Sequence, residues 1–370
     1  MALDRITLSH FRNHEESRLD GSARFNLLIG ENGAGKTNVL EALSLFAPGR
    51  GLRRAPLVDM AMKPAPGTDQ ASEIGGFAVS ASLDCGDGRD PVRLGTGARG
   101  DKPGRRLVQI NGADSSAMAL GEWLAISWLT PAMDGLFTDS AGVRRRYLDR
   151  LTLALDPGHA QRATRYETAL RERNRLLDGD ADPDPAWMDA IEAQLAEHGA
   201  ALCAGRVMLV ERLNQALETL PDQPFARPVL SYVSGGPTNE AGLADDLRRN
   251  RQRDRAARRT LSGPHRDELN VAMAGKGLPA SACSTGEQKA MLIAITLAHA
   301  HLAARGRPGI LLLDEVAAHL DPIRRGALFD RLGDTGTQVW MTGTEMPPFE
   351  AIRDEAAIWY VNGGAVQRAA

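Results

Sequence analysis

A phosphate-loop sequence lies near the start of this 370-residue chain, and an apolar stretch that ends in two acids lies near its finish. Residues 30–37 read Gly-Glu-Asn-Gly-Ala-Gly-Lys-Thr and fit the G-x-x-x-x-G-K-S/T pattern. Residues 310–315 read Ile-Leu-Leu-Leu-Asp-Glu, and such an apolar run suits the centre of a parallel sheet. A nucleotide site that uses both stretches predicts an α/β head assembled from both chain ends, with a large insertion between them.

The context of the first stretch fits a nucleotide-binding loop. Leu27–Ile29 predicts a buried strand before it, and apolar residues at helical spacing over 38–46 predict a helix after it. Lys36 is expected to reach the β- and γ-phosphates and the Thr37 hydroxyl to bind Mg²⁺. A glycine-rich turn with a chance lysine would not need this strand–loop–helix order. The residues expected to contact the nucleotide are Gly30, Glu31, Asn32, Gly33, Ala34, Gly35, Lys36, Thr37 and Asn38.

The second stretch supplies two carboxylates. Asp314 is expected to hold Mg²⁺ together with Thr37, directly or through water. Glu315 is placed to activate the attacking water as a general base, which makes Glu315 and Lys36 the candidate catalytic residues. Alone, the same stretch could be a strand end with two solvated acids; the phosphate loop favours the catalytic interpretation.

Residues 284–289 read Ser-Thr-Gly-Glu-Gln-Lys and begin a predicted helix that continues to residue 304. Ser284 and Glu287 form a capping-box pattern, which by itself indicates only a helix start. Together with the Asp-Glu strand and with Ala-Ala-His-Leu-Asp at 317–321, it resembles the signature motif, Walker B and D-loop of ABC-type ATPases. The SMC-like branch of that class places these motifs at the two chain ends. The resemblance implies a head-to-tail dimer in which Ser284, Gly286 and Asp321 contact nucleotide at the interface.

Three further stretches narrow the resemblance. Residues 8–13 read Leu-Ser-His-Phe-Arg-Asn, residues 144–149 read Arg-Arg-Arg-Tyr-Leu-Asp, and residues 263–269 read Gly-Pro-His-Arg-Asp-Glu-Leu. They are similar to segments of the RecF family of bacterial DNA replication and repair proteins, and the third is the most specific. Two features depart from ABC-type patterns: Thr342-Gly343-Thr344 stands where a switch histidine is common, and 128–134 lacks a Q-loop glutamine.

The resemblance implies a function in recombinational repair. It implies ATP and Mg²⁺ as cofactors, Arg12 as a further nucleotide contact, and a weak DNA-dependent ATPase. An ATP-driven homodimer would clamp single- and double-stranded DNA at gaps, without sequence specificity, and help to load recombinase with RecO and RecR. Slow hydrolysis would release it.

The insertion has a helical character. Helices are expected over about 156–178 and 186–220, separated by a break at 179–185, and they would form an arm roughly 30–50 Å long. The insertion contains no Cys-x-x-Cys for a zinc hook. The predicted domains are a head (1–139 and 262–370) and a helical arm (140–261). The head includes an antiparallel lobe near 74–112, with strands at 77–83 and 107–111 and a mobile loop at 95–104. Seven arginines within 248–259 either track DNA phosphates or form a solvated helix face, and the sequence does not decide between them.

Composition narrows the class of protein. A net charge of −3 means that any DNA-binding surface is local. Three scattered cysteines favour a reducing compartment, and the absence of a signal peptide or a 20-residue apolar run favours a cytoplasmic protein without membrane contact. Two rivals are a transporter ATPase subunit, which the split motifs disfavour, and a scaffold that never turns over ATP, which Glu315 disfavours.

Overall fold

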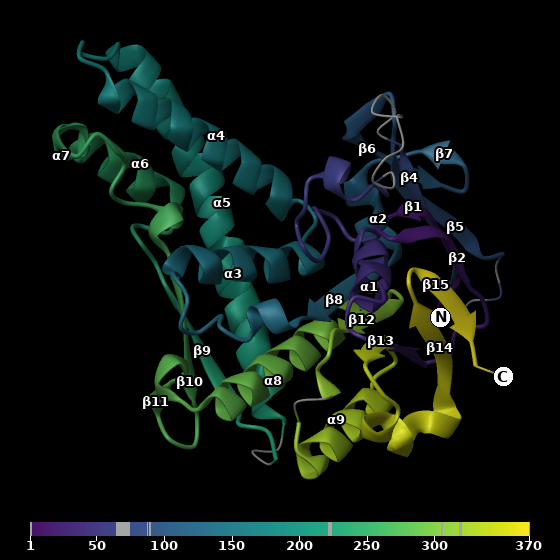
Figure 1. Ribbon diagram of the computed structural model, residues 1–370. Helices are drawn as coiled ribbons and strands as arrows, with labels where there is room; N and C mark the ends of the chain where they lie inside the picture. The colour runs from purple at the N-terminus through teal and green to yellow at the C-terminus, as the bar shows by residue number, and fades with distance from the viewer. Residues whose placement is uncertain are drawn as a thin grey trace. The chain divides into compact units, whose positions relative to one another are not determined.

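The computed structural model describes residues 2–63, 75–86, 88, 90–220, 224–304, 306–317 and 320–369. The chain divides into two compact units. Unit 1 comprises Met1–Met133 and Thr296–Ala370, and unit 2 comprises Asp134–Ile295. Both chain ends therefore belong to unit 1 (Figure 1), as the two separated motifs required.

A mostly parallel sheet forms the centre of unit 1. Its order is β15-β14-β3-β13-β12-β8, and only the β14–β15 pair is antiparallel. Every residue of β3, β8, β12 and β13 is buried, which explains their continuous apolar sequences. The strands are β3 (Phe25–Ile29), β8 (Ala125–Leu129), β12 (Gly309–Leu313), β13 (Gln338–Gly343), β14 (Ala356–Asn362) and β15 (Ala365–Arg368). The prediction that both chain ends build one sheet is confirmed.

A second, antiparallel sheet of unit 1 has the order β2-β1-β4-β5-β6-β7. In β4, buried residues alternate with more exposed ones, as expected for a strand with one face on the core. The strands are β1 (Ala2–Phe11), β2 (His14–Leu19), β4 (Phe77–Asp84), β5 (Val92–Arg99), β6 (Lys102–Ile110) and β7 (Ala113–Asp114). The two strands predicted for an antiparallel lobe are confirmed.

The mobile loop predicted at 95–104 is wrong. These residues form the end of β5, a tight turn and the start of β6, with a register irregularity beside Arg99. The glycines serve close approach rather than flexibility: a Cβ on Gly97 would lie 2.2 Å from the carbonyl oxygen of Phe77. A glycine-rich strand is therefore easily mistaken for a loop when only its composition is considered.

Helix α1 (Lys36–Ser44) lies between the two sheets of unit 1 and contacts β1 and β13. Its apolar residues Val39, Leu40 and Leu43 belong to one core with residues of both sheets. Trp340 and Trp359 stack in that core with ring centroids 5.3 Å apart. The other helical segments of unit 1 are η1 (Leu57–Asp59), α2 (Ala117–Trp123), η2 (Pro131–Met133), the end of α8 (Thr285–Ala304), α9 (Pro322–Asp334) and η6 (Pro347–Glu355).

Unit 2 is dominated by the antiparallel pair α4 and α5 (Figure 1), as predicted, and α5 is about 50 Å long at 1.5 Å per residue. A three-stranded sheet, β11-β10-β9, was not predicted. Because β10 pairs with β9, residues 262–295 pack within unit 2, whereas the sequence had assigned them to the head. The elements are α3 (Ala141–Leu155), α4 (His159–Asp178), α5 (Pro185–Glu218), β9 (Pro228–Val233), α6 (Glu240–Arg249), α7 (Arg251–Ala256), η3 (Pro264–Arg266), β10 (Glu268–Met273), β11 (Leu278–Pro279), η4 (Ala280–Ala282) and the start of α8.

The Gly-Pro-His-Arg-Asp stretch fastens β10 inside unit 2. Asp267 is 1% exposed and accepts hydrogen bonds from Arg206 (2.6 Å), from the backbone N–H of Gly235 (2.8 Å) and from the Tyr232 hydroxyl. Arg206 also forms a bidentate pair with Asp149, at 2.8 and 2.9 Å. Burial raises the pKa of Asp149, but His159 and Arg206 outweigh it, so that this pKa is lowered. Within the described part of the chain, no helix is long and apolar enough to cross a membrane.

Candidate nucleotide site

The phosphate loop connects β3 to α1 in the geometry that its sequence predicts. Gly35 directly precedes α1 with φ of 114°, a conformation that a side chain would strain. The loop is anchored to the parallel sheet by a hydrogen bond of 3.2 Å from the N–H of Gly30 to the carbonyl of Gly343 at the end of β13. The N-terminus of α1 therefore points its free N–H groups toward the loop, where an anion is favoured.

Lys36 places its ammonium group over the loop. Its Nζ donates to the carbonyl oxygens of Gly30 (2.6 Å) and Glu31 (2.8 Å). Burial lowers the pKa of Lys36, and the carboxylates of Glu315 and Asp314 offset part of that effect. A phosphate chain in the loop would meet this charge together with the backbone donors.

The two motifs meet at Thr37 and Asp314. The Thr37 hydroxyl donates to the Asp314 carboxylate at 2.9 Å, although 277 positions separate the two residues. Thr342, buried at the end of β13, donates to the same carboxylate at 2.8 Å. A hydroxyl and a carboxylate side by side are the hard oxygen donors that Mg²⁺ prefers, and this ion usually completes its shell with phosphate oxygens and water. The residues fit a Mg²⁺–nucleotide complex.

Glu315 follows β12 in a left-handed backbone conformation, with φ of 53°. Its N–H donates to the Thr342 hydroxyl at 2.8 Å, so Thr342 links Asp314 to Glu315. A non-glycine residue in this region costs about 1–2 kcal/mol, and such strain clusters at functional sites. Thr342 occupies the segment where the sequence lacks a switch histidine; Thr344, the other residue considered there, is exposed.

Arg12 was expected to contact the nucleotide, and the structure gives it protein partners. Its guanidinium forms a bidentate pair with the fully buried Glu41, at 2.8 and 2.9 Å, and donates to the carbonyl of Asp59. Arg53 donates to both Glu41 (2.8 Å) and Asn38 (2.7 Å). This cluster ties α1 to the turn between β1 and β2 and to Arg53 and Asp59, and a nucleotide contact by Arg12 stays a prediction.

The signature residues lie in unit 2. The capping box is confirmed, because the N–H of Ser284 donates to Glu287 at 2.9 Å and the Ser284 hydroxyl reaches the same carboxylate. A hydrogen bond from Lys276 and those from Ser284 lower the pKa of Glu287 to about 2. Ser284 and Gly286 are exposed at the start of the long helix α8, as an interface role requires. That role stays a prediction.

The structure thus brings together the phosphate loop, Asp314 and Glu315 in unit 1, and leaves Ser284 and Gly286 in unit 2. Asp321 caps α9 by accepting from the N–H of Arg324. Residues 318 and 319 of the proposed D-loop lie outside the described residues. Three residues around the loop were not predicted: Glu41, Arg53 and His14. None of them stands in a recognised motif, and each contacts residues more than ten positions away in the chain.

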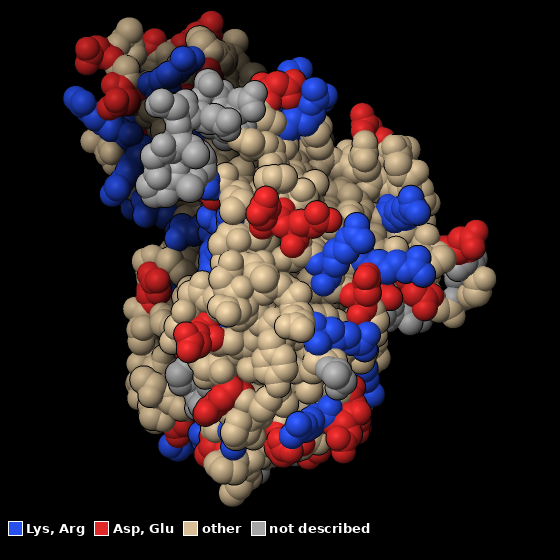
Figure 2. Space-filling model, turned by 45° about the vertical axis from the view of Figure 1, so that its right-hand side comes forward, with Lys and Arg blue, Asp and Glu red and all other residues tan. Residues whose placement is uncertain are grey.

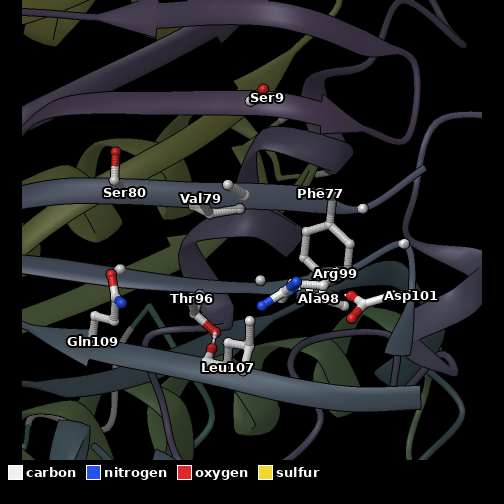
Figure 3. A pocket seen from close by; sticks show the side chains of 15 residues that line it. Ser9, Phe77, Val79, Ser80, Thr96, Ala98, Arg99, Asp101, Leu107 and Gln109 are labelled. Carbon is white, nitrogen blue, oxygen red and sulfur yellow. Dashed lines mark hydrogen bonds and ion pairs between the residues drawn. The ribbon is translucent and has the colours of Figure 1, made fainter. Parts of the chain in front are cut away.

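A hollow of about 770 Å³ lies elsewhere in unit 1, on the antiparallel sheet (Figure 3). The polar side chains that line it include Ser9, Ser80 and Gln109 on three strands, and Arg99, which is paired with Asp101 at 2.9 Å. Among the described residues that line it, none comes from the phosphate loop or the Asp-Glu stretch.

Comparisons with known proteins agree with this geometry. A family model described as the RecF/RecN/SMC N-terminal domain matches residues 2–366. The chain is 48% identical to the DNA replication and repair protein RecF of Mesorhizobium japonicum over 378 residues, covering 98% of this chain and 97% of that protein. It is 45% identical to RecF of Brucella suis, covering 98% and 95%.

Solved structures show the same fold. A structure of the recombination mediator protein RecF-ATPrS in the RecFOR pathway matches with a TM-score of 0.84 at 22% identity, covering 100% of this chain and 98% of that one. The Smc head domain from Pyrococcus furiosus, bound to the C-terminal domain of ScpA, matches with a TM-score of 0.53 at 16% identity, covering 99% and 95%.

Proposed function

Because the chain belongs to the RecF family, we propose that it is an ATP-dependent DNA-binding protein of recombinational repair. The observation that carries this proposal is the 2.9 Å contact between Thr37 and Asp314, which joins the phosphate loop and the Walker B strand into one site. Solved RecF structures have been obtained with ATP and ATPrS, which supports ATP as the nucleotide.

The residues of unit 1 have distinct roles in hydrolysis. The phosphate loop and Lys36 bind and orient the phosphates, with the ammonium group already at the mouth of the loop. Thr37 and Asp314 would hold Mg²⁺, which supplies charge neutralisation at the β- and γ-phosphates when bound. Glu315 accepts a proton from the attacking water, and Thr342 holds the peptide N–H that fixes its backbone.

DNA binding follows from dimerisation. Two subunits would sandwich two ATP molecules, each between the phosphate loop of one subunit and Ser284, Gly286 and Asp321 at the interface with the other. The closed dimer would hold DNA at gaps and double-strand/single-strand junctions, and slow hydrolysis would open it. RecO and RecR are the proposed partners in recombinase loading, since the similar RecF structures come from the RecFOR pathway.

The net charge of the chain restricts DNA contacts to local surfaces. On part of the face in Figure 2, basic and acidic side chains alternate, in keeping with a net charge of −3. Contacts to phosphates carry no sequence information, so little sequence preference and a steep salt dependence are expected.

Replacement of Lys36 tests the proposal. Lys36→Ala is expected to abolish ATP-dependent retention on gapped DNA and ATP-dependent dimerisation, because the phosphate charge loses its main cationic partner. The exposed residue Lys102 provides the control: Lys102→Ala should behave as wild type. Sedimentation with and without ATP and DNA measures both effects. Wild-type DNA retention by Lys36→Ala in ATP would refute the proposed coupling.

A further inference from the structure

The turn between β1 and β2 brings His14 against the phosphate loop. His14 is fully buried, and its Nε2 lies 3.1 Å from the carbonyl oxygen of Gly35. Its Nδ1 lies 2.9 Å from the hydroxyl of Ser17, which in turn lies 2.9 Å from the carbonyl oxygen of Gly364. A chain of three contacts therefore connects the phosphate loop to the turn between β14 and β15.

The turn between β14 and β15 also contacts the phosphate loop directly. The N–H of Gly364 donates to the carbonyl of Ala34 at 2.9 Å, and the Asn13 amide donates to that carbonyl at 3.1 Å. A Cβ on Gly364 would lie 1.9 Å from the carbonyl oxygen of Asn13, so the two backbones approach as closely as glycine permits. The C-terminal hairpin is thus part of the support of the loop.

Hydrogen counting shows what His14 contributes. Both carbonyl oxygens only accept, and the Ser17 hydroxyl carries one hydrogen. A neutral imidazole carries one N–H hydrogen. If that hydrogen is on Nε2, it bonds the Gly35 carbonyl and Nδ1 must accept from Ser17; if it is on Nδ1, it bonds the Ser17 hydroxyl, which can then donate to the Gly364 carbonyl. The ring cannot do both. Burial lowers the pKa of His14 below its ordinary value, although the Gly35 and Gly364 carbonyls counteract this, so the neutral ring is favoured. The Ser17 hydroxyl, when it donates to Nδ1, leaves the hydrogen on Nε2 and directs it at Gly35.

We propose that His14 is a positioning residue for the nucleotide: its Nε2–H holds the Gly35 carbonyl, and the Ser17 hydroxyl holds the imidazole ring by donating to Nδ1 rather than to the Gly364 carbonyl. This inference rests on the proposed function. The Gly35 carbonyl and the Lys36 N–H belong to one planar trans peptide and point in opposite directions. Holding the oxygen toward His14 therefore keeps the N–H turned toward the phosphate side. The Gly35 carbonyl also accepts from the N–H groups of Asn38 (3.0 Å) and Val39 (3.2 Å), so His14 adds a donor from outside the helix.

Two replacements separate positioning from folding. In His14→Gln, the amide nitrogen takes the place of Nε2 and keeps a donor toward Gly35. In His14→Asn, the shorter amide takes the place of Nδ1 and keeps only the contact with Ser17. Both leave a polar, smaller side chain in the same buried space, so their effects on thermal stability should be similar.

Binding of the non-hydrolysable analogue AMPPNP with Mg²⁺, measured by calorimetry on the full chain, is the test. One hydrogen bond contributes about 0.5–1.5 kcal/mol net, so His14→Asn should weaken binding about 2- to 10-fold relative to His14→Gln. The Gln variant should bind within about 2-fold of wild type. The AMPPNP affinity of Ser17→Ala should lie between those of the two His14 variants, because the imidazole ring keeps its donor but loses the hydroxyl that orients it.

The outcomes are distinct. Equal AMPPNP affinity of the Asn and Gln variants would overturn this inference alone, whether both match wild type or both weaken in proportion to lost thermal stability. A wild-type protein that does not bind AMPPNP would overturn the proposed function and this inference with it.

Discussion

Thr342 and Glu315 show at the residue scale how a short stretch sets up chemistry. The Thr342 hydroxyl lies 2.8 Å both from the Asp314 carboxylate and from the N–H of Glu315. It thus holds the proposed Mg²⁺-binding carboxylate and the backbone of the proposed base in one arrangement. The strained φ of Glu315 is compatible with a residue whose position is fixed by its neighbours rather than by its own preference.

Glu315→Gln should remove the proposed base while keeping the shape of the side chain. Hydrolysis is expected to fall by roughly 10²–10⁴-fold, the usual contribution of a general base, while ATP binding persists. Dimers should then live longer in ATP and stay longer on DNA. Glu345→Gln, on an exposed residue after β13, is the matched control and should leave turnover unchanged. Steady-state turnover by Glu315→Gln at the wild-type rate would show that another group takes the proton.

The site residues that could be predicted stand inside contiguous motifs. The residues that were missed are recognised only by partners far away in the chain. Lys36 and Asp314 could be named because each stands inside a recognisable stretch. His14 could not, since its connection to Gly364 through Ser17 spans nearly the whole chain. Arg12 was named from resemblance alone, and only the structure reveals that its guanidinium group pairs with Glu41.

At the scale of elements, the buried hydrogen bonds that Asp267 accepts from Arg206, Tyr232 and Gly235, here called the Asp267 clasp, explain what the Gly-Pro-His-Arg-Asp stretch does. It closes β10 onto β9 and onto helices α3 and α5 through Arg206. Asp267→Asn removes one of the two carboxylates that neutralise the buried Arg206. It should therefore lower the free energy of unfolding by about 3 kcal/mol. Asp245→Asn, on the exposed face of α6, should change it by less than about 0.5 kcal/mol. Urea unfolding measures both, and equal midpoints for the two variants would contradict the clasp.

Both long helices of unit 2 were predicted well. The start at Asp156-Pro157 and the break at 179–185 set the limits of α4, and a recurring apolar face indicated α5. The sheet β11-β10-β9 escaped prediction because β9 and β10 are short and pair across a helical segment, so neither has a local turn signal. The β5–β6 hairpin escaped for a different reason: its glycines allow close backbone approach, and composition alone cannot distinguish that from a loop.

The arginines of 248–259, open in the sequence, fall into two groups in unit 2. Arg248, Arg251, Arg255 and Arg258 pair with carboxylates of the α4–α5 region, at Asp189, Glu192, Asp182 and Asp178. Arg249, Arg253 and Arg259 are exposed and make no ion pair with any residue that the structure describes. The first group fastens α6 and α7; the second is available to phosphates.

Replacing the arginines of each group with glutamine tests this division. The triple variant of Arg249, Arg253 and Arg259 should bind DNA more weakly at low salt. Its slope of log affinity against log salt should be shallower by up to about 2.7, because each phosphate contact contributes about 0.9. The triple variant of Arg248, Arg255 and Arg258 is matched in charge and should keep the slope while losing some thermal stability. Identical slopes for the two variants, measured by fluorescence anisotropy, would refute a distinct DNA-contacting group.

At the scale of the whole molecule, the family and the head built from both chain ends were predicted from motifs, and both are confirmed. The phosphate loop belongs to unit 1 and the proposed signature residue Ser284 to unit 2. If the signature serves the nucleotide of a second subunit, defects on opposite sides of the interface should complement each other.

Ser284→Arg places a bulky side chain at the exposed start of α8. It should spare ATP binding by the monomer but block ATP-driven dimerisation and hydrolysis. Mixing it with Lys36→Ala gives heterodimers in which one site has an intact Lys36 facing an intact Ser284, and the other carries both defects. Partial recovery of ATPase activity on mixing is expected if one composite site can act alone, and each variant by itself is the control. Normal ATP-driven dimerisation of Ser284→Arg, measured by sedimentation, would reduce Ser284 to a helix cap, because a side chain of that size cannot share the interface with a γ-phosphate.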